Sequence, residues 1–191
     1  MYSVRPCCNL VGQCDKLTID EDTCASCLTC FRVCPLDAVE IGPGEPGMVA
    51  NPVRCQACGV CAAVCPAGAI TLSYWGSTDL KAQPFAAAPA VALVCRHVKD
   101  TPPAEGLIVR VPCLARLKAV DVLDLFRQGY GNVRLYPCAK EECKYGEAWE
   151  NIQSLAEYVS GLLARVRPEV RIDLCLPQGV AKAGEETAGE L

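Results

Sequence analysis

The chain of 191 residues has little histidine, tryptophan or methionine, with one, two and two of them respectively. It also lacks an apolar run long enough to span a bilayer. No apolar stretch of signal-peptide length opens the sequence, and no Asn-x-Ser/Thr glycosylation acceptor occurs in it. These absences argue against a secreted disulfide scaffold and against a membrane protein, and they predict a soluble, cytoplasmic protein.

Signatures of catalysis are missing as well. The only histidine, His97, leaves little scope for a Cys–His pair, and the serines show no nucleophile-elbow pattern. The letters G-x-G-x-x-G occur at residues 42–47, but this stretch holds two prolines and does not join a strand to a helix, as a dinucleotide site requires. We interpret it as a turn. No catalytic residue is predicted, and a non-catalytic subunit of an oxidoreductase complex is expected.

Negative charge is unevenly placed along the chain. Residues 1–80 contain four Lys or Arg and eight Asp or Glu, whereas residues 81–191 contain fourteen of each, so the net charge of −4 belongs to the first part. The lack of a basic excess argues against nucleic acid as a partner. A partner with a basic docking patch is the more natural complement.

Cysteine is abundant, with 16 residues, and half of them form an internal repeat. The motif C-x2-C-x2-C-x3-C-P occurs at residues 24–35 and again at 55–66, with an offset of 31 residues. Three thiolates of such a turn bind one [4Fe–4S] cluster, and in two-cluster ferredoxins the cysteine before the proline binds the other cluster. Zinc or disulfides fit less well, because zinc usually takes two separated C-x2-C pairs. The predicted ligands are Cys24, Cys27, Cys30 and Cys65 for the first cluster, and Cys55, Cys58, Cys61 and Cys34 for the second.

With these motifs, residues 17–74 resemble the bacterial two-cluster ferredoxins, and the match holds at every ligand position. The acidic segment at 18–22 and the loop between the motifs are also similar to that family. The resemblance implies an α+β ferredoxin-like dicluster domain and low-potential, one-electron transfer. Cys7, Cys8 and Cys14 are additional to the family pattern.

The second half alternates between short apolar runs and amphipathic segments. Strands are expected there at 91–95, 107–113, 133–136 and 170–175, and helices at 114–128 and 152–166, after a strand at 70–74 that closes the first half. Strands that alternate with helices indicate a small α/β domain with a parallel sheet. The predicted organisation is a dicluster ferredoxin domain at 1–76, a linker at 77–90, the α/β domain at 91–176 and a mobile tail at 177–191.

Four cysteines end or follow the strands of this α/β half: Cys95, Cys113, Cys138 and Cys143. The C-terminal ends of parallel strands share one edge of a sheet, where ligands bind, so these thiols are expected to converge. Four thiolates suit a [2Fe–2S] cluster or a zinc ion, and buried free cysteines are the plain alternative. His97 is an alternative iron ligand, although a solvated histidine is favoured because four thiolates are already available.

The same half resembles the delta-subunit family of methyl-viologen-reducing hydrogenase, also called the hydrogenase iron–sulfur subunit. The resemblance covers about residues 91–167 and rests on the four cysteines within LVCRH, VRVPCLARL and YPCAKEECKYGEA. It implies a [2Fe–2S] cluster and electron transfer between a hydrogenase or formate dehydrogenase and a heterodisulfide-reductase-like flavoprotein, often in complexes that bifurcate electrons. Anaerobic metabolism is expected, since exposed clusters are sensitive to oxygen. Val98 stands where the family usually has another cysteine, and Lys144 where it often has histidine.

Four cysteines are left without a cluster: Cys7, Cys8, Cys14 and Cys175. Free or regulatory thiols are favoured over a fourth site. The leading hypothesis is an electron-transfer adaptor subunit. Two alternatives stay open: a redox-responsive sensor that uses the remaining thiols, and a thiol oxidoreductase that uses Cys138 and Cys143, whose spacing differs from the usual C-x-x-C.

Overall fold

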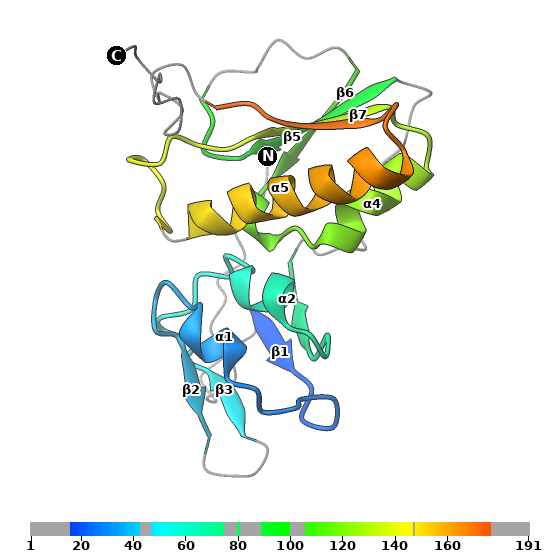
Figure 1. Ribbon diagram of the computed structural model, residues 1–191. Coiled ribbons are helices and arrows are strands. Elements are labelled where there is room, and N and C mark those ends of the chain that lie inside the picture. The colour runs from blue at the N-terminus through cyan, green and yellow to red at the C-terminus, as the bar shows by residue number, and fades with distance from the viewer. Residues whose placement is uncertain are drawn as a thin grey trace, which may run out of the picture.

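The computed structural model describes residues 16–42, 47–74, 80, 89–99, 106–146 and 148–176. Figure 1 shows two domains in chain order, the first in blue to cyan and the second in green to orange. Three of the leftover cysteines (Cys7, Cys8 and Cys14), most of the predicted linker and the predicted tail lie outside the described residues. None of the helices in the described part of the chain is long and apolar enough to cross a membrane.

The first domain consists of two antiparallel strand pairs and two short helices. Strand β1 (Leu17–Ile19) pairs with β4 (Ile70–Leu72), and β2 (Val39–Ile41) pairs with β3 (Met48–Ala50). The helices are α1 (Thr29–Arg32) and α2 (Val60–Val64). Each helix ends within two residues of a Cys-Pro pair, because proline disfavours helical backbone at the residue before it. The domain is therefore of the α+β class.

The internal repeat of the sequence is also a repeat of backbone conformation. The residue before each helix lies in the left-handed region, with φ of 60° at Leu28 and 90° at Gly59. Two residues earlier, Ser26 and Ala57 have φ of 49° and 53°. The tight cysteine turn thus takes the same path in both halves, although only the second half has glycine before its helix. Leu28 shows that this turn accepts a side chain at that position.

The second domain is a parallel four-stranded sheet with the order β6-β5-β7-β8. Its strands are β5 (Ala90–Cys95), β6 (Leu107–Val111), β7 (Asn132–Tyr136) and β8 (Arg171–Leu174). Helices α4 (Ala119–Arg127) and α5 (Ala148–Val166) pack against each other on one side of the sheet (Figure 1). Strand β5 is buried along its whole length, as a central strand of a parallel sheet should be. The expected parallel sheet with helices is confirmed.

The prediction of one helix over 114–128 is wrong at its beginning. A 3-10 helix, η1 (Leu114–Arg116), comes first, and extended backbone at Leu117 separates it from α4. The Asp121 carboxylate accepts a hydrogen bond of 3.0 Å from the Lys118 N–H, which caps α4 at this point. Because η1 is separate from α4, it is free to contact the first domain.

The two domains share one hydrophobic core. Cys58 and the fully buried Val60, from the second cysteine motif, belong to the same apolar cluster as Leu93 of β5 and Leu114 of η1. Helix α2 packs against η1, which Figure 1 shows at the junction between the domains. A smaller apolar cluster inside the first domain includes Leu17 and Met48. The second motif therefore takes part in both clusters, because Cys58 and Val60 belong to the core of the second domain whereas Cys55 and Cys61 belong to the smaller cluster.

Candidate iron–sulfur sites

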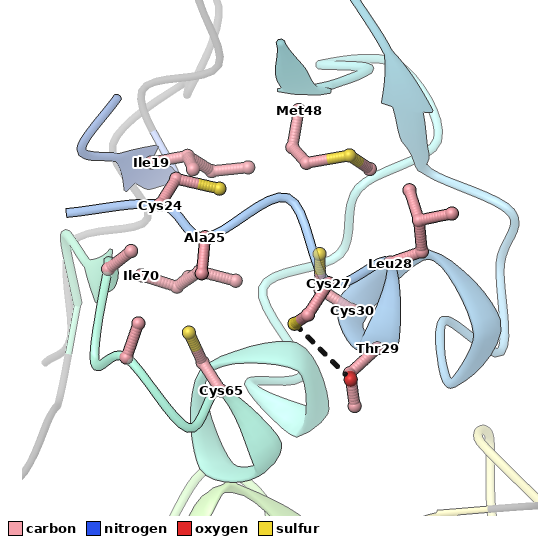
Figure 2. A pocket seen from close by; sticks show the side chains of 12 residues that line it. Ile19, Cys24, Ala25, Cys27, Leu28, Thr29, Cys30, Met48, Cys65 and Ile70 are labelled. Carbon is pink, nitrogen blue, oxygen red and sulfur yellow. Dashed lines mark hydrogen bonds between the residues drawn. The ribbon is translucent and has the colours of Figure 1, made fainter. Parts of the chain in front are cut away.

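The first group of cysteines surrounds a single pocket. Cys24, Cys27, Cys30 and Cys65 lie around one space in Figure 2. The other lining side chains are mostly apolar, among them Ile19, Met48 and Ile70. The pocket has about 340 Å³ of empty space, part of it open solvent. Three of these cysteines belong to the first motif and the fourth to the second, so the structure brings together the four residues that the sequence predicts for the first cluster.

The thiols of this pocket differ in exposure and acidity. Cys27 is exposed, and a hydrogen bond with Thr29 (Sγ to Oγ1, 3.4 Å) lowers the pKa of its thiol. Burial raises the pKa of Cys30, and the nearby charges of Cys24 and Cys27 act in the same direction. Grouped thiols oppose one another's ionisation, and a bound iron cluster would relieve that repulsion by holding them as thiolates. The donor set fits a [4Fe–4S] cluster with one edge near solvent.

The second group is more deeply buried. Cys55, Cys58 and Cys61 are buried, and Cys34 is half-buried. Burial, together with the charges of Cys58, Cys55 and Cys34, raises the pKa of Cys61 to about 12. Burial also raises the pKa of Cys58, and Cys34 adds to that effect. Cys34 comes from the first motif, so this group also combines three cysteines of one motif with the last cysteine of the other.

The third group lies where the strands of the second domain end. Burial raises the pKa of Cys113 to about 12, and the charges of Cys95 and Cys143 are among the further causes. A hydrogen bond between the Cys95 and Cys138 thiols lowers the pKa of Cys95 to about 6 and raises the pKa of Cys138. Cys143 also forms a hydrogen bond with Cys138. These four thiols interact with one another, as the parallel topology leads one to expect.

A tryptophan holds one strand end of this third group in place. The indole Nε1–H of Trp149, on α5, donates a buried hydrogen bond of 3.0 Å to the carbonyl of Cys138. Buried tryptophan usually satisfies its single donor in this way. Helix α5 therefore fixes the loop that follows β7.

Comparison with family models gives two matches. Residues 16–66 match the model of a 4Fe-4S dicluster domain, and residues 85–175 match that of the methyl-viologen-reducing hydrogenase, delta subunit. The chain joins these two domains in this order. No curated protein matches it. The first match supports [4Fe–4S] clusters, and the two together indicate an electron-transfer role.

His97 lies beside the cysteine group of the delta-subunit domain without being enclosed by it. The side chain is exposed, and its Nε2 accepts a hydrogen bond of 3.2 Å from Arg96 Nε. His97 is also one of the lesser causes that lower the pKa of Cys95. This arrangement fits the solvated histidine that the sequence favours.

Cys175 follows β8 and is half-buried. Burial raises the pKa of its thiol, and Tyr136 forms a hydrogen bond with it. A raised pKa makes a thiol a poor nucleophile at neutral pH, so Cys175 has the character of a structural cysteine.

Sequence reasoning missed three residues around these sites: Gly59, Arg116 and Tyr145. Each stands within two or three residues of a predicted ligand, and this proximity was the signal available. No group of three or more His, Cys, Asp or Glu side chains in the described ranges is arranged to hold a single metal ion.

Proposed function

We propose that this protein is an electron-transfer adaptor subunit with three iron–sulfur clusters. Two [4Fe–4S] clusters belong to the dicluster domain and one [2Fe–2S] cluster to the delta-subunit domain. The observation that carries the proposal is the gathering of three groups of four cysteines in a chain whose two halves share one core. Bound clusters would supply one-electron transfer. The protein would supply the thiolates, the apolar surroundings and the fixed spacing.

The proposed ligands follow the three groups. The first cluster is held by Cys24, Cys27, Cys30 and Cys65, the second by Cys55, Cys58, Cys61 and Cys34, and the third by Cys95, Cys113, Cys138 and Cys143. The first site has an exposed cysteine, whereas three ligands of the second and three of the third are buried. The first site is therefore the natural point of exchange with an external redox partner, and the second lies inside, next to the delta-subunit domain.

The proposed partners are a hydrogenase or formate dehydrogenase and a heterodisulfide-reductase-like flavoprotein. The match to a hydrogenase delta subunit supports this assignment. The acidic excess of residues 1–80 favours a basic docking surface on the partner that meets the dicluster domain. We place the complex in the cytoplasm of an anaerobic cell.

A thiol oxidoreductase is less well supported. The low pKa of Cys95 and its bond to Cys138 resemble an activated thiol pair. Both residues are buried, however, and a reactive thiol has to reach its substrate. A sensor that works through Cys175 is also less well supported, because burial raises the pKa of that thiol and so makes it less reactive.

The experiment is an anaerobic titration of the purified chain with reduced methyl viologen, followed by visible absorbance. Three one-electron centres should accept about three electrons per chain. The matched control is Cys175→Ser, which removes a cysteine outside the three groups and should leave the electron count unchanged. Uptake of no electrons by the wild-type chain would rule out the adaptor.

A further inference from the structure

A buried arginine stands at the junction of the two domains. Arg116, the last residue of η1, is only 5% exposed. Its Nη2 donates a hydrogen bond of 2.6 Å to the carbonyl of Ala57, and its Nη1 donates one of 3.1 Å to the carbonyl of Tyr74. Ala57 lies between two predicted ligands of the second cluster, and Tyr74 follows the last strand of the dicluster domain. One side chain of the delta-subunit domain thus forms hydrogen bonds with the dicluster domain at two points.

The dicluster domain is shaped to receive this arginine. A Cβ atom added at Gly59 would lie 2.5 Å from the Arg116 Cβ and 3.1 Å from its Nε. The equivalent position of the first motif is Leu28, which has a full side chain on the same backbone turn. The turn therefore accepts a side chain at φ of 60°, whereas φ of 90° at Gly59 is unfavourable for a residue with a Cβ even before the contact with Arg116 is considered. The second motif lacks a side chain at this position where Arg116 packs against it.

The arginine also lies between two cysteine groups. The backbone N–H of Arg116 donates a hydrogen bond of 3.4 Å to the carbonyl of Cys113, and Cys58 and Cys113 belong to the same buried cluster. Burial lowers the pKa of Arg116, and the charges of Cys113 and Cys58 act in the opposite direction. Cys113 belongs to the third group and Cys58 to the second, and Cys58 is also among the charges that raise the pKa of Cys113. Tyr145, which is buried, interacts with both cysteines and with Arg116. The second and third cysteine groups therefore meet at Arg116.

A guanidinium remains charged in proteins, and a buried charge is costly unless it is compensated. Two backbone carbonyls compensate part of this charge. Thiolate-bound clusters on either side would add negative charge, and reduction makes a cluster more negative still. A fixed positive charge at this place would stabilise the reduced state of the clusters bound nearest to it.

We propose that Arg116 is a positioning residue that couples the second cysteine site to the third, because it clamps the turn between Cys55 and Cys58 and favours the reduced state of both neighbouring clusters. This inference rests on the proposed function, since it requires clusters at these two sites. The first site serves as an internal reference, because the hydrogen bonds of Arg116 to Ala57 and Tyr74 do not reach its cysteines.

The test compares Arg116→Met, Arg116→Lys and Arg127→Met in the anaerobically purified full chain. Arg127 is a largely exposed arginine at the end of α4, paired with Asp124 at 3.0 Å, and serves as the matched control. The readout is the midpoint potential of each cluster, from redox titration followed by EPR. The first cluster is assigned as the signal that Cys27→Ser alters.

We expect Arg116→Met to lower the potentials of the second and third clusters while the first stays in place. A tenfold fall in the ratio of reduced to oxidised cluster corresponds to about 59 mV for a one-electron couple, and a shift of at least this size is expected. Arg116→Lys should retain most of the potential, because it keeps the charge, and Arg127→Met should change nothing.

Three results would overturn the inference. In the first, Arg116→Met keeps its clusters and all potentials match the wild type. In the second, Arg116→Lys lowers the potentials of the second and third clusters as far as Arg116→Met does. In the third, the potentials of all three clusters shift equally. The second and third results would indicate a structural role only. If Arg116→Met loses a cluster, Arg116→Lys provides the test: potentials close to the wild type support the inference, and lowered potentials contradict it. A wild-type chain without iron would instead refute the proposed function itself, before any variant is compared.

Discussion

The close approach of Arg116 to Gly59 leads to a prediction about stability. Replacement of Gly59 by alanine should destabilise the protein in two ways. The residue has φ of 90°, which is unfavourable for any residue with a Cβ, and the new Cβ would collide with Arg116. Two other glycines separate these effects. Gly68 and Gly129 have φ of 69° and 109°, on either side of the value at Gly59, and a Cβ at either would meet nothing within 4 Å.

The magnitudes follow from the two causes. Left-handed backbone costs a residue with a Cβ about 1–2 kcal/mol, so Gly68→Ala and Gly129→Ala should each lose about that much. Overpacking in a close-packed core adds about 1–3 kcal/mol, so Gly59→Ala should lose roughly 2–5 kcal/mol. In a protein of this size, 1 kcal/mol shifts the unfolding temperature by about 2–4 °C.

The assay is thermal unfolding of the anaerobically purified chains, at one scan rate because cluster loss makes unfolding irreversible. Gly59→Ala should unfold well below both control variants, and they should differ little from each other. Equal unfolding temperatures for all three variants would refute the reasoning, because they would show that Arg116 does not press against the turn.

Three further outcomes are expected. In the cluster-free chain, iodoacetamide should modify Cys27 before Cys61, as mass spectrometry can show, because Cys27 is exposed with a lowered pKa while burial raises the pKa of Cys61 to about 12; preferential labelling of Cys61 would contradict this. Trp149→Phe should lose about 1 kcal/mol in the free energy of unfolding, because the carbonyl of Cys138 loses its donor, and the EPR signal of the third cluster should change while those of the dicluster domain do not. Cys175→Ser should leave all EPR signals unchanged, and the loss of one would place Cys175 among the ligands.

Much of the fold could be predicted because it depends on local patterns. The two cysteine motifs fix the turns and short helices of the dicluster domain, and the apolar runs at 91–95 and 133–136 became β5 and β7 within a residue of the expected bounds. Strands β2 and β3 were missed, because three-residue strands carry too little periodicity to be detected. Strand β6 ends at Val111 and not at 113, since Pro112 has no N–H to continue the sheet.

The junction between the domains could not be predicted, for a physical reason. The apolar positions at 114, 117 and 120 fit a continuous helix, and the pattern does not reveal that Asp121 caps a new helix start at Lys118. The role of Arg116 depends on hydrogen bonds to carbonyls 42 and 59 residues away. Contacts over such distances leave no periodic trace in a single sequence, so a charged residue beside Cys113 gave no sign of being buried.

The most direct test of the account is the content of iron and acid-labile sulfide per chain, with EPR of the reduced protein, for the wild type and for Cys113→Ser. Two [4Fe–4S] clusters and one [2Fe–2S] cluster predict about ten irons in the wild type. Cys113→Ser should retain about eight and lose one EPR signal. About eight irons in both proteins, with identical spectra, would contradict the account and leave a dicluster ferredoxin joined to a domain without a cluster.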